Sequence, residues 1–146
     1  MSVAHPGPVV VELRLSARAT LIPTVRTVAA DLAARADLDL DAIDDLRMAV
    51  DEACTTLVRL TTEDESLLCV FTLVRDGIEF SVRTRAAWAG AQVSTESFGW
   101  RVLQTLTDDV RVLDGPAGPA DEDAVSRDDE HGSVGIALLK RAGGVR

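Results

Sequence analysis

One stretch of twenty-one residues, from Leu40 to Leu60, constrains the fold more than any other part of the chain. It contains no glycine or proline. Six apolar residues recur along it at spacings of three and four: Ile43, Leu46, Val50, Ala53, Leu57 and Leu60. That spacing predicts an amphipathic helix with one side buried against a sheet. Asp39 or Asp41 can cap its start, because a carboxylate there accepts hydrogen bonds from free backbone N–H groups.

The composition excludes several kinds of protein. With 146 residues, 47% of them hydrophobic and 27% charged, the chain has the size and balance of one globular domain. The net charge of −9 argues against direct binding of nucleic acid, because phosphates would repel such a surface. A basic protein partner fits better. The alternative is that the acidic surface serves only to keep the protein in solution.

The ends of the chain and its cysteines bear on location. The first residues lack a basic segment followed by an apolar one, and no apolar run approaches the ~20 residues that span a bilayer. We therefore expect a cytoplasmic protein without membrane contact. Cys54 and Cys69 do not have C-x-x-C spacing, so we expect buried, reduced thiols. No His/Cys cluster with the spacing of metal ligands is present, and we predict no metal site on that basis.

Periodicity divides the remainder of the chain into strands and helices. Alternation of apolar and polar residues, or short apolar runs, predicts strands at 9–15, 66–74, 78–82, 110–113 and 134–138. Helical spacing predicts helices at 16–36, 40–60 and 97–107, with Pro23 in the first turn of the first one. The dipeptide Asp76-Gly77 predicts the turn of a β-hairpin.

The other segments are expected to be irregular. Residues 86–96 read as a loop of a length that is often functional or mobile in a compact domain, and a lid is one such role. Residues 114–132, rich in glycine, proline and acids and including His131, read as a flexible loop. We place one domain at 9–140, a tail that includes His5 at 1–8, and a basic tail at 141–146 that loosens from Lys140 onward.

The order of elements predicts the fold class. Runs of helices and of strands, rather than strict alternation, indicate an α+β two-layer sandwich. We expect three helices on one face of a mixed, mostly antiparallel sheet.

Glu52 and Thr56 are the candidate site within the long helix. Residues four apart are neighbours on one helix face, so this pair can position a water and a metal-bound phosphate together. The alternative is that Glu52 is a solvated surface charge. The chain has no P-loop, no Rossmann glycine pattern and no nucleophile elbow.

Three strings carry a resemblance to a known family. Residues 45–53 read DLRMAVDEA, residues 97–110 read SFGWRVLQTLTDDV, and Gly132 is followed by Ser133. In their order and spacing they resemble bacterial anti-sigma factors of the RsbW type, from about residue 9 to residue 140. These are small serine kinases of the GHKL superfamily, which also contains the ATPase domains of gyrase, MutL and histidine kinases. The resemblance implies the Bergerat ATPase version of the sandwich.

The resemblance also implies roles for single residues. Glu52 matches the family's general base, and Thr56 stands where an Asn ligates magnesium. Thr84 stands where an Asp receives the adenine amino group. A neutral hydroxyl is a poorer magnesium ligand than an amide carbonyl, and Thr84 offers no carboxylate.

Further departures concern the family's glycines. Ala86 and Trp88 replace glycines that give the nucleotide room, and Ser97 with Gly99 stands where two glycines are usual. Ser133 stands where a Thr opens the last strand. Loss of a charged hydrogen bond and a metal ligand together costs about 3 to 6 kcal/mol. We therefore expect ATP and magnesium to bind weakly or not at all, with any nucleotide contacts coming from Thr56, Thr84, Gly99 and Ser133.

The partners follow from the same resemblance. The family forms homodimers and contacts a sigma factor through an Arg at the start of its first helix, and an anti-anti-sigma factor reverses this binding. The string LRLSA at 13–17, followed by Arg26, matches that pattern, which makes Arg26 and Arg14 the candidate contacts. A solvated helix charge is the alternative for Arg26. An active serine kinase using Glu52 and a separate histidine-kinase ATPase domain are the alternatives for the function.

Overall fold

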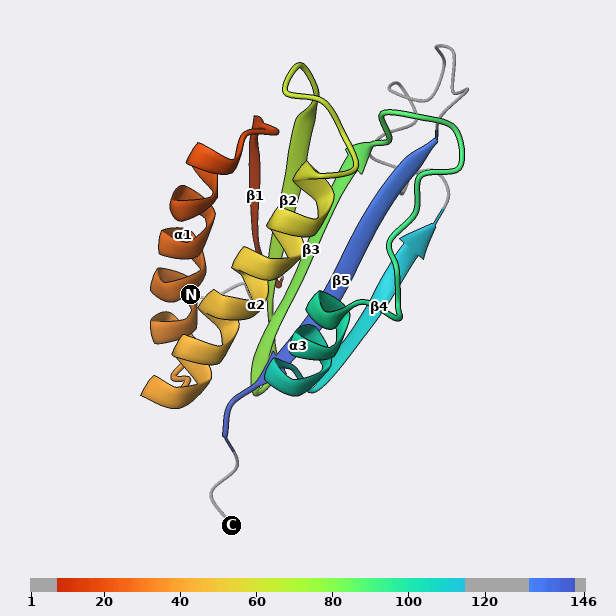
Figure 1. The fold of residues 1–146 in the computed structure, drawn as a ribbon. Helices are drawn as coiled ribbons and strands as arrows, with labels where there is room; N and C mark the ends of the chain where they lie inside the picture. Colours follow the sequence, from red (N-terminus) through yellow and green to blue (C-terminus); the bar gives the residue numbers. More distant parts are fainter. Residues whose placement is uncertain (1–7, 115–131, 144–146) are drawn as a thin grey trace.

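Three helices lie on one face of a five-stranded sheet in the computed structural model (Figure 1), which describes residues 8–114 and 132–143. The elements are β1 (Val9–Ser16), α1 (Ile22–Arg35), α2 (Leu40–Val58), β2 (Ser66–Val74), β3 (Gly77–Arg85), α3 (Phe98–Leu106), β4 (Asp109–Asp114) and β5 (Ser133–Arg141), with a 3₁₀ turn, η1, at Ala19–Leu21. The strand order is β1-β2-β3-β5-β4. The predicted α+β sandwich is confirmed, and among the described strands every neighbouring pair is antiparallel.

Helix α2 occupies the centre of the helical layer (Figure 1), and it buries one side, as the apolar spacing predicted. Its buried residues are Ala42, Leu46, Ala49, Val50, Ala53, Cys54 and Leu57. The Asp39 carboxylate caps the helix by accepting a hydrogen bond of 2.8 Å from the Ala42 N–H group. Beneath the helices the rings of Phe71 and Phe80 pack 4.8 Å apart between β2 and β3. This core positions the residues of the candidate site.

The first helix begins later than we predicted. Ser16 belongs to β1, and the Ala17 N–H group continues the strand's pairing by donating to the Glu65 carbonyl oxygen at 2.9 Å. Helix α1 starts at Ile22, not at residue 16. Pro23 explains the difference, because it has no N–H group and is tolerated only in the first turn of a helix.

The hairpin forms as predicted, but its turn is one residue earlier. Val74 pairs with Gly77, so the two turn residues are Arg75 and Asp76, and Asp76 adopts a left-handed φ of 65°. Gly77 is the first residue of β3. A Cβ atom there would lie 2.5 Å from the Lys140 carbonyl oxygen, so the close approach of β5 requires the glycine.

The expected basic tail from Lys140 is wrong in its first residues. Lys140 and Arg141 lie in β5, and the Lys140 ammonium group is 3.2 Å from the Asp45 carboxylate of α2. The strand therefore crosses the expected domain boundary at residue 140. The flexible loop expected at 114–132 falls almost wholly outside the described residues, as do most of the tails expected at 1–8 and 141–146. In the described part of the chain, no helix has the length and apolar character needed to cross a membrane.

Candidate functional site

The two candidate residues of the long helix lie one turn apart on α2, and Glu52 faces α3. Thr56 is one helical turn beyond Glu52, and both side chains are half-buried. A Cβ atom built on Gly99 of α3 would collide with the Glu52 Oε1 atom, so the carboxylate rests directly on this glycine. The structure thus brings Glu52 and Gly99 together. It does so by direct packing of the carboxylate on the helix.

The start of α3 provides a favourable place for that carboxylate. Ser97 caps the helix by accepting a hydrogen bond of 3.1 Å from the Trp100 N–H group. The carboxylate of Glu52 lies beside Gly99 in the first turn, near the positive end of the helix dipole. In this arrangement Glu52 therefore stabilises α3 electrostatically.

Thr56 uses its hydroxyl group within its own helix. The Oγ1 atom donates a hydrogen bond of 2.9 Å to the Glu52 carbonyl oxygen, four residues earlier. This is a common arrangement for a threonine inside a helix. It leaves only neutral lone pairs for a cation, which prefers carboxylate or carbonyl oxygens.

Thr84 is buried and serves to join three segments. Its side chain is 5% exposed, and its hydroxyl donates to the Ser66 carbonyl oxygen at 2.9 Å. The Thr84 hydroxyl oxygen also lies 3.3 Å from the Thr61 hydroxyl oxygen. The Thr61 hydroxyl donates to the Arg85 carbonyl oxygen at 2.6 Å. These bonds connect β3, the start of β2 and the segment that follows α2. The Thr84 hydroxyl group therefore already donates its hydrogen bond to the protein's own backbone.

The segment after β3 is tied to the body of the domain at two points. The Ala86 N–H group donates to the Gly132 carbonyl oxygen at 3.0 Å, and the Ala87 N–H group donates to the Leu60 carbonyl oxygen at 2.8 Å. Ala86 and Val93 are buried, whereas Trp88 is 48% exposed. Figure 1 shows this segment, in green, running along the sheet to α3.

Ser133 and the glycine before it lie beside this segment. Ser133 begins β5 and pairs with Arg85, next to Thr84, and its side chain is half-buried. Four of the positions with candidate nucleotide roles therefore fall into two places: Thr56 and Gly99 flank Glu52, and Ser133 is near Thr84.

The two candidate partner contacts lie on different surfaces. The Arg26 guanidinium on α1 is 3.3 Å from the Asp51 carboxylate on α2, and the two side chains are 39% and 41% exposed. Asp51 directly precedes Glu52. Arg14 is exposed on β1, between Leu13 and Leu15, which pack against the core. Since neighbouring residues of a strand point to opposite faces, Arg14 lies on the sheet face that the helices leave uncovered.

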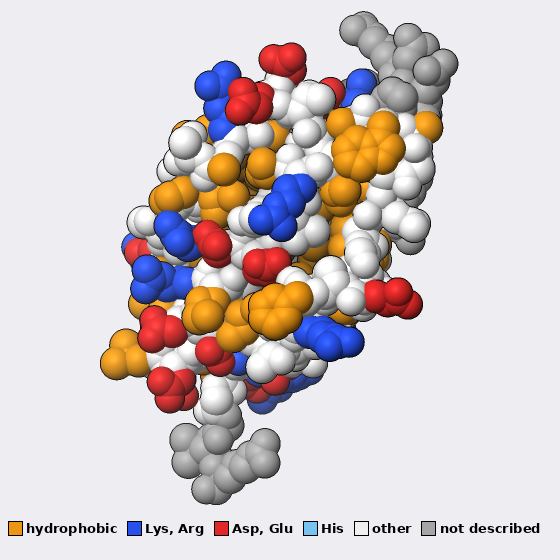
Figure 2. Space-filling model, viewed as in Figure 1, with side chains coloured by type: hydrophobic (Ala, Val, Ile, Leu, Met, Phe, Trp, Pro, Cys, Tyr) orange, Lys and Arg blue, Asp and Glu red, His pale blue; other side chains and the backbone are white. Residues whose placement is uncertain are grey.

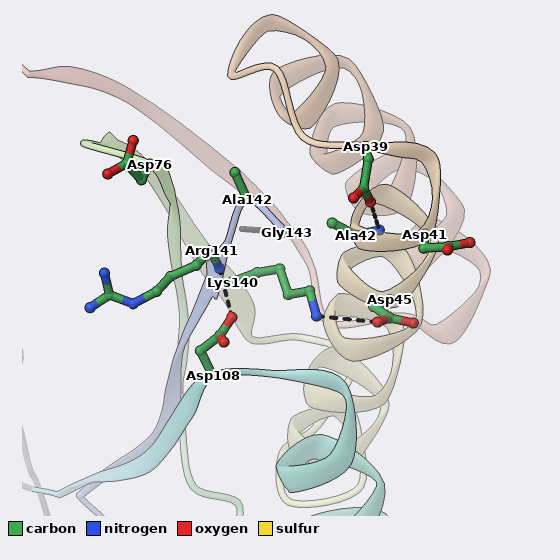
Figure 3. A pocket seen from close by; sticks show the side chains of 10 residues that line it. All are labelled: Asp39, Asp41, Ala42, Asp45, Asp76, Asp108, Lys140, Arg141, Ala142 and Gly143. Carbon is green, nitrogen blue, oxygen red and sulfur yellow. Dashed lines mark hydrogen bonds and ion pairs between the residues drawn. The ribbon is translucent and has the colours of Figure 1, made fainter. Parts of the chain in front are cut away.

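A cavity of about 770 Å³ lies at the other end of α2 (Figure 3). It is lined by the start of α2, the β2–β3 turn and the end of β5. Asp45 pairs with Lys140, and Asp108 accepts a hydrogen bond of 2.7 Å from the Arg141 N–H group. Asp45 and Thr56 are eleven residues apart, about 16 Å along a helix axis. Glu52 is seven residues beyond Asp45, about 10 Å along the helix axis, so the cavity lies about two helical turns from it. Three of the cavity's acids, Asp39, Asp45 and Asp108, have structural partners.

The helical face otherwise mixes both signs of charge with apolar side chains. Figure 2 shows hydrophobic side chains gathered over α2 and α3, with acidic and basic side chains around them. Among the exposed large apolar residues are Met48, at 56%, and Phe98, at 81%. No group of three or more His, Cys, Asp or Glu residues in the described chain is arranged to hold a metal ion.

The cysteine prediction is confirmed in its structural part. Cys54 on α2 and Cys69 on β2 are both buried and unbridged. A hydrogen bond with Cys69, with burial as the second cause, raises the pKa of the Cys54 thiol well above its ordinary value. The thiol is therefore protonated near neutral pH.

The hydrogen bonds around Thr84 were not predicted from the sequence. The strand pattern did contain a signal, because Thr84 continues the inward series Ile78, Phe80 and Val82. A polar residue at a buried position of a strand requires a hydrogen-bond partner. Its partners Ser66 and Thr61 are 18 and 23 residues away, beyond the reach of local patterns.

Comparisons with known proteins agree on one family. Residues 15–142 match the family model described as the histidine kinase-like ATPase domain. The chain is 39% identical over 104 residues to a Mycobacterium tuberculosis protein named anti-sigma-F factor RsbW, covering 70% of this chain and 61% of that protein. It is 30% identical over 122 residues to a Bacillus cereus protein named serine-protein kinase RsbW, covering 70% of this chain and 76% of that one.

A solved structure supports the fold. The crystal structure of the RsbU and RsbW domains of a Mycobacterium tuberculosis protein superposes with a TM-score of 0.60. The superposition covers 90% of this chain and 32% of that one, at 16% identity. At that identity the likeness concerns the fold alone.

Proposed function

The chain belongs to the histidine kinase-like ATPase domain family, and from that premise we propose that it is an anti-sigma factor. It sequesters an alternative sigma factor in the cytoplasm as a homodimer. An anti-anti-sigma partner then releases the sigma factor. In this proposal the domain is a binding module that works without turnover of ATP.

The observation that carries the proposal is the likeness to proteins named RsbW. A relative with 39% identity is named an anti-sigma-F factor. Because this chain spans 61% of that relative's length, the binding of a sigma factor is carried over as a proposal.

The residues at the nucleotide positions support binding without ATP. Thr84 stands where the adenine contact is expected, and it is buried with its hydroxyl bound to the Ser66 carbonyl oxygen. Thr56 stands at the magnesium position and donates to its own helix. Glu52 packs on Gly99. These side chains do not fit the donor set that a magnesium nucleotide requires, and no step of the proposed function passes through one.

The charge of the chain supports a protein partner with a basic surface. The net charge is −9, and Arg26 lies beside the acidic residues of α2 in a half-exposed ion pair with Asp51. An exposed ion pair contributes little to stability, about 0 to 1 kcal/mol. Arg26 is therefore available to exchange Asp51 for an acidic group of the partner at small cost to the fold.

Sigma-factor binding is tested by a pull-down with each sigma factor of the source genome. The purified protein should retain one of them, and Arg26→Ala should weaken that complex at least tenfold while its unfolding free energy changes by less than about 0.5 kcal/mol. Arg35→Ala is the matched control, because Arg35 is on the same helix in an exposed pair with Asp31. Retention of no sigma factor by the wild-type protein would refute the proposal.

An active serine kinase is the second candidate function, and one observation favours it. Glu52, the residue that matches the family's general base, is present and half-buried, and a relative with 30% identity is named a serine-protein kinase. Calorimetric titration with magnesium and ATP separates the two functions. Saturable binding at millimolar nucleotide, with phosphotransfer lost in Glu52→Gln, would establish the kinase. No saturation is the result we expect.

A further inference from the structure

An apolar patch lies exposed where α2 meets the start of α3. Met48 on α2 and Phe98 on α3 are both more than half exposed. The two helices meet where Glu52 rests on Gly99. Met48 lies one helical turn before Glu52 on α2. Phe98 directly precedes Gly99 on α3, so both apolar side chains belong to the same meeting of the two helices. Figure 2 shows hydrophobic side chains gathered over these helices.

Val102 extends the patch along α3. It follows Phe98 by four residues, one helical turn, and is half-buried. We call Met48, Phe98 and Val102 the α2–α3 patch. Single exposed apolar residues are ordinary on a protein surface, whereas apolar residues gathered in one place are typical of a surface that another molecule covers. An aromatic ring and a flexible methionine are side chains that such contacts favour.

Carboxylates border the patch on its α2 side. Four of them lie three or four residues from Met48, and so within about one helical turn of it: Asp44, Asp45, Asp51 and Glu52. Helix α2 as a whole contains five acidic residues and one basic residue, Arg47, which leaves it a net charge of −4. The neighbourhood of the patch on this helix is therefore strongly acidic.

The carboxylates remain accessible although three of them have basic partners. Asp44 pairs with Arg47, Asp45 with Lys140 and Asp51 with Arg26. Each of these three carboxylate side chains is 40% or more exposed. A carboxylate can accept several hydrogen bonds, so a second cation can reach it without displacing the first. The acidic border is thus open to a basic group from outside the chain.

We infer that the α2–α3 patch binds an amphipathic helix of a protein partner, with basic residues beside the apolar stripe of that helix. A helix presents apolar residues three and four positions apart, which suits a patch formed by two adjacent helices. The basic residues of the partner face the carboxylates of α2, because Arg101 lies on the α3 side, three residues after Phe98. The inference adds a docking surface to the proposed binding module and does not require that the partner be a sigma factor.

Charge favours this occupant over others. Nucleic acid and an anionic membrane surface are negatively charged, and α2 repels both. A second copy that docks through the same patch brings together two α2 helices that each have a net charge of −4. An acidic helix meets the same repulsion. A basic amphipathic helix gains from the apolar patch and from its acidic border together.

A designed peptide tests the inference. The probe is a labelled amphipathic helix of leucine and lysine, about 18 residues long so that it is able to form a helix. Fluorescence anisotropy should show saturable binding to the wild-type protein. A peptide of the same composition, in an order without helical periodicity, should bind at least tenfold more weakly. The original helix with glutamate in place of lysine should also bind at least tenfold more weakly.

Substitutions in the apolar part locate the binding site. Phe98→Ser and Met48→Ser should each weaken binding of the leucine–lysine helix at least fivefold, because each removes a large apolar side chain from the contact. Val10→Ser is the matched control. Val10 is also an exposed apolar residue, but it lies on the sheet face that the helices leave uncovered, so the affinity should not change. Thermal unfolding confirms that each variant is folded.

A single carboxylate tests the acidic border. Asp44→Asn should weaken binding of the leucine–lysine helix about two- to fivefold, the range expected for one exposed charge pair. Asp31→Asn is the matched control, because Asp31 is likewise in an exposed pair, with Arg35, but on α1. It should leave the affinity unchanged.

Three results would each overturn the inference. The first is no saturable binding of the leucine–lysine helix to the wild-type protein. The second is equal binding of the three peptides, and the third is an affinity that Phe98→Ser and Met48→Ser leave unchanged; either would show that no amphipathic helix is recognised at this patch. Binding through the patch by a protein that retains no sigma factor would support the inference and refute only the proposed function.

Discussion

Thr84 brings a hydroxyl group to a position where its strand is otherwise apolar. Thr84→Val keeps the shape of the side chain and removes its hydrogen bond to the Ser66 carbonyl oxygen. We expect the free energy of unfolding to fall by about 1 to 3 kcal/mol, because a buried carbonyl group loses its donor. Chemical denaturation measures this. Thr105→Val, on the exposed side of α3, should change it by less than about 0.5 kcal/mol, and an equal effect at both sites would contradict the role of Thr84.

The contact between Glu52 and Gly99 is also open to measurement. Alanine is favoured over glycine in a helix by about 1 kcal/mol, but its Cβ atom at position 99 would collide with the Glu52 carboxylate. Gly99→Ala should therefore stabilise the protein more in a Glu52→Ala background than in wild type, by about 0.5 to 1 kcal/mol. The same substitution in an Asp51→Ala background is the control. If Gly99→Ala changes the free energy of unfolding equally in wild type, in Glu52→Ala and in Asp51→Ala, Glu52 does not rest on Gly99.

We expect the Cys54 thiol to lower the free energy of unfolding at alkaline pH. Its pKa is raised in the folded protein above the ordinary value of 9.0, so the unfolded chain releases this proton first as pH rises. The stabilisation is complete below pH 9 and is lost as pH rises toward the higher, folded pKa. The free energy of unfolding of wild type should therefore decline above pH 9, and that of Cys54→Ala should decline less. The chain has no tyrosine and one lysine, Lys140, so few other groups titrate there.

The beginning of α2 shows how much one capping residue contributes to an element. Asp39→Ala removes the acceptor of the Ala42 N–H group and should lower the free energy of unfolding by about 0.5 to 2 kcal/mol. Asp39→Asn retains an acceptor and should cost less. Asp41→Ala, in the first turn but not the cap, is the control, with a smaller loss of dipole stabilisation. A larger loss at Asp41 than at Asp39 would contradict the assignment of the cap.

The helices and strands could be predicted from local patterns wherever one hydrophobic period extends over a whole segment. The apolar spacing of 40–60 predicted α2, and alternation predicted β1 and β3, because each of these elements buries one face. The start of α1 was predicted too early, because Ala19–Leu21 form a separate 3₁₀ turn and Pro23 is tolerated only in the first turn of the helix that follows. At the hairpin, Gly77 was assigned to the turn when its role is to admit the neighbouring β5.

The candidate site could be predicted only in part. A resemblance of ordered motifs singled out Glu52 and Gly99 separately, but it did not predict their direct contact. The burial of Thr84 and its bonds to Ser66 and Thr61 depend on how three distant segments meet, which no local pattern contains. The separation of Arg14 from Arg26 likewise depends on which sheet face the helices cover. Such features belong to tertiary packing and required the structure.

At the scale of the whole molecule, the net charge of −9 determines how a partner approaches. A basic partner is attracted from beyond contact distance, and salt screens that attraction. Under the proposed function, the association rate with the retained sigma factor should fall at least tenfold between about 50 and 500 mM salt, whereas the dissociation rate should change little. Rapid-mixing kinetics measures both.

Arg26 provides the comparison that separates approach from contact. Arg26→Ala makes the chain more acidic by one charge, so attraction of a basic partner should not decrease, yet it removes a group proposed to touch that partner. Its effect should therefore lie in the dissociation rate. A wild-type association rate that is independent of salt would show that the acidic surface does not steer the partner, and the charge would then serve only to keep the protein in solution.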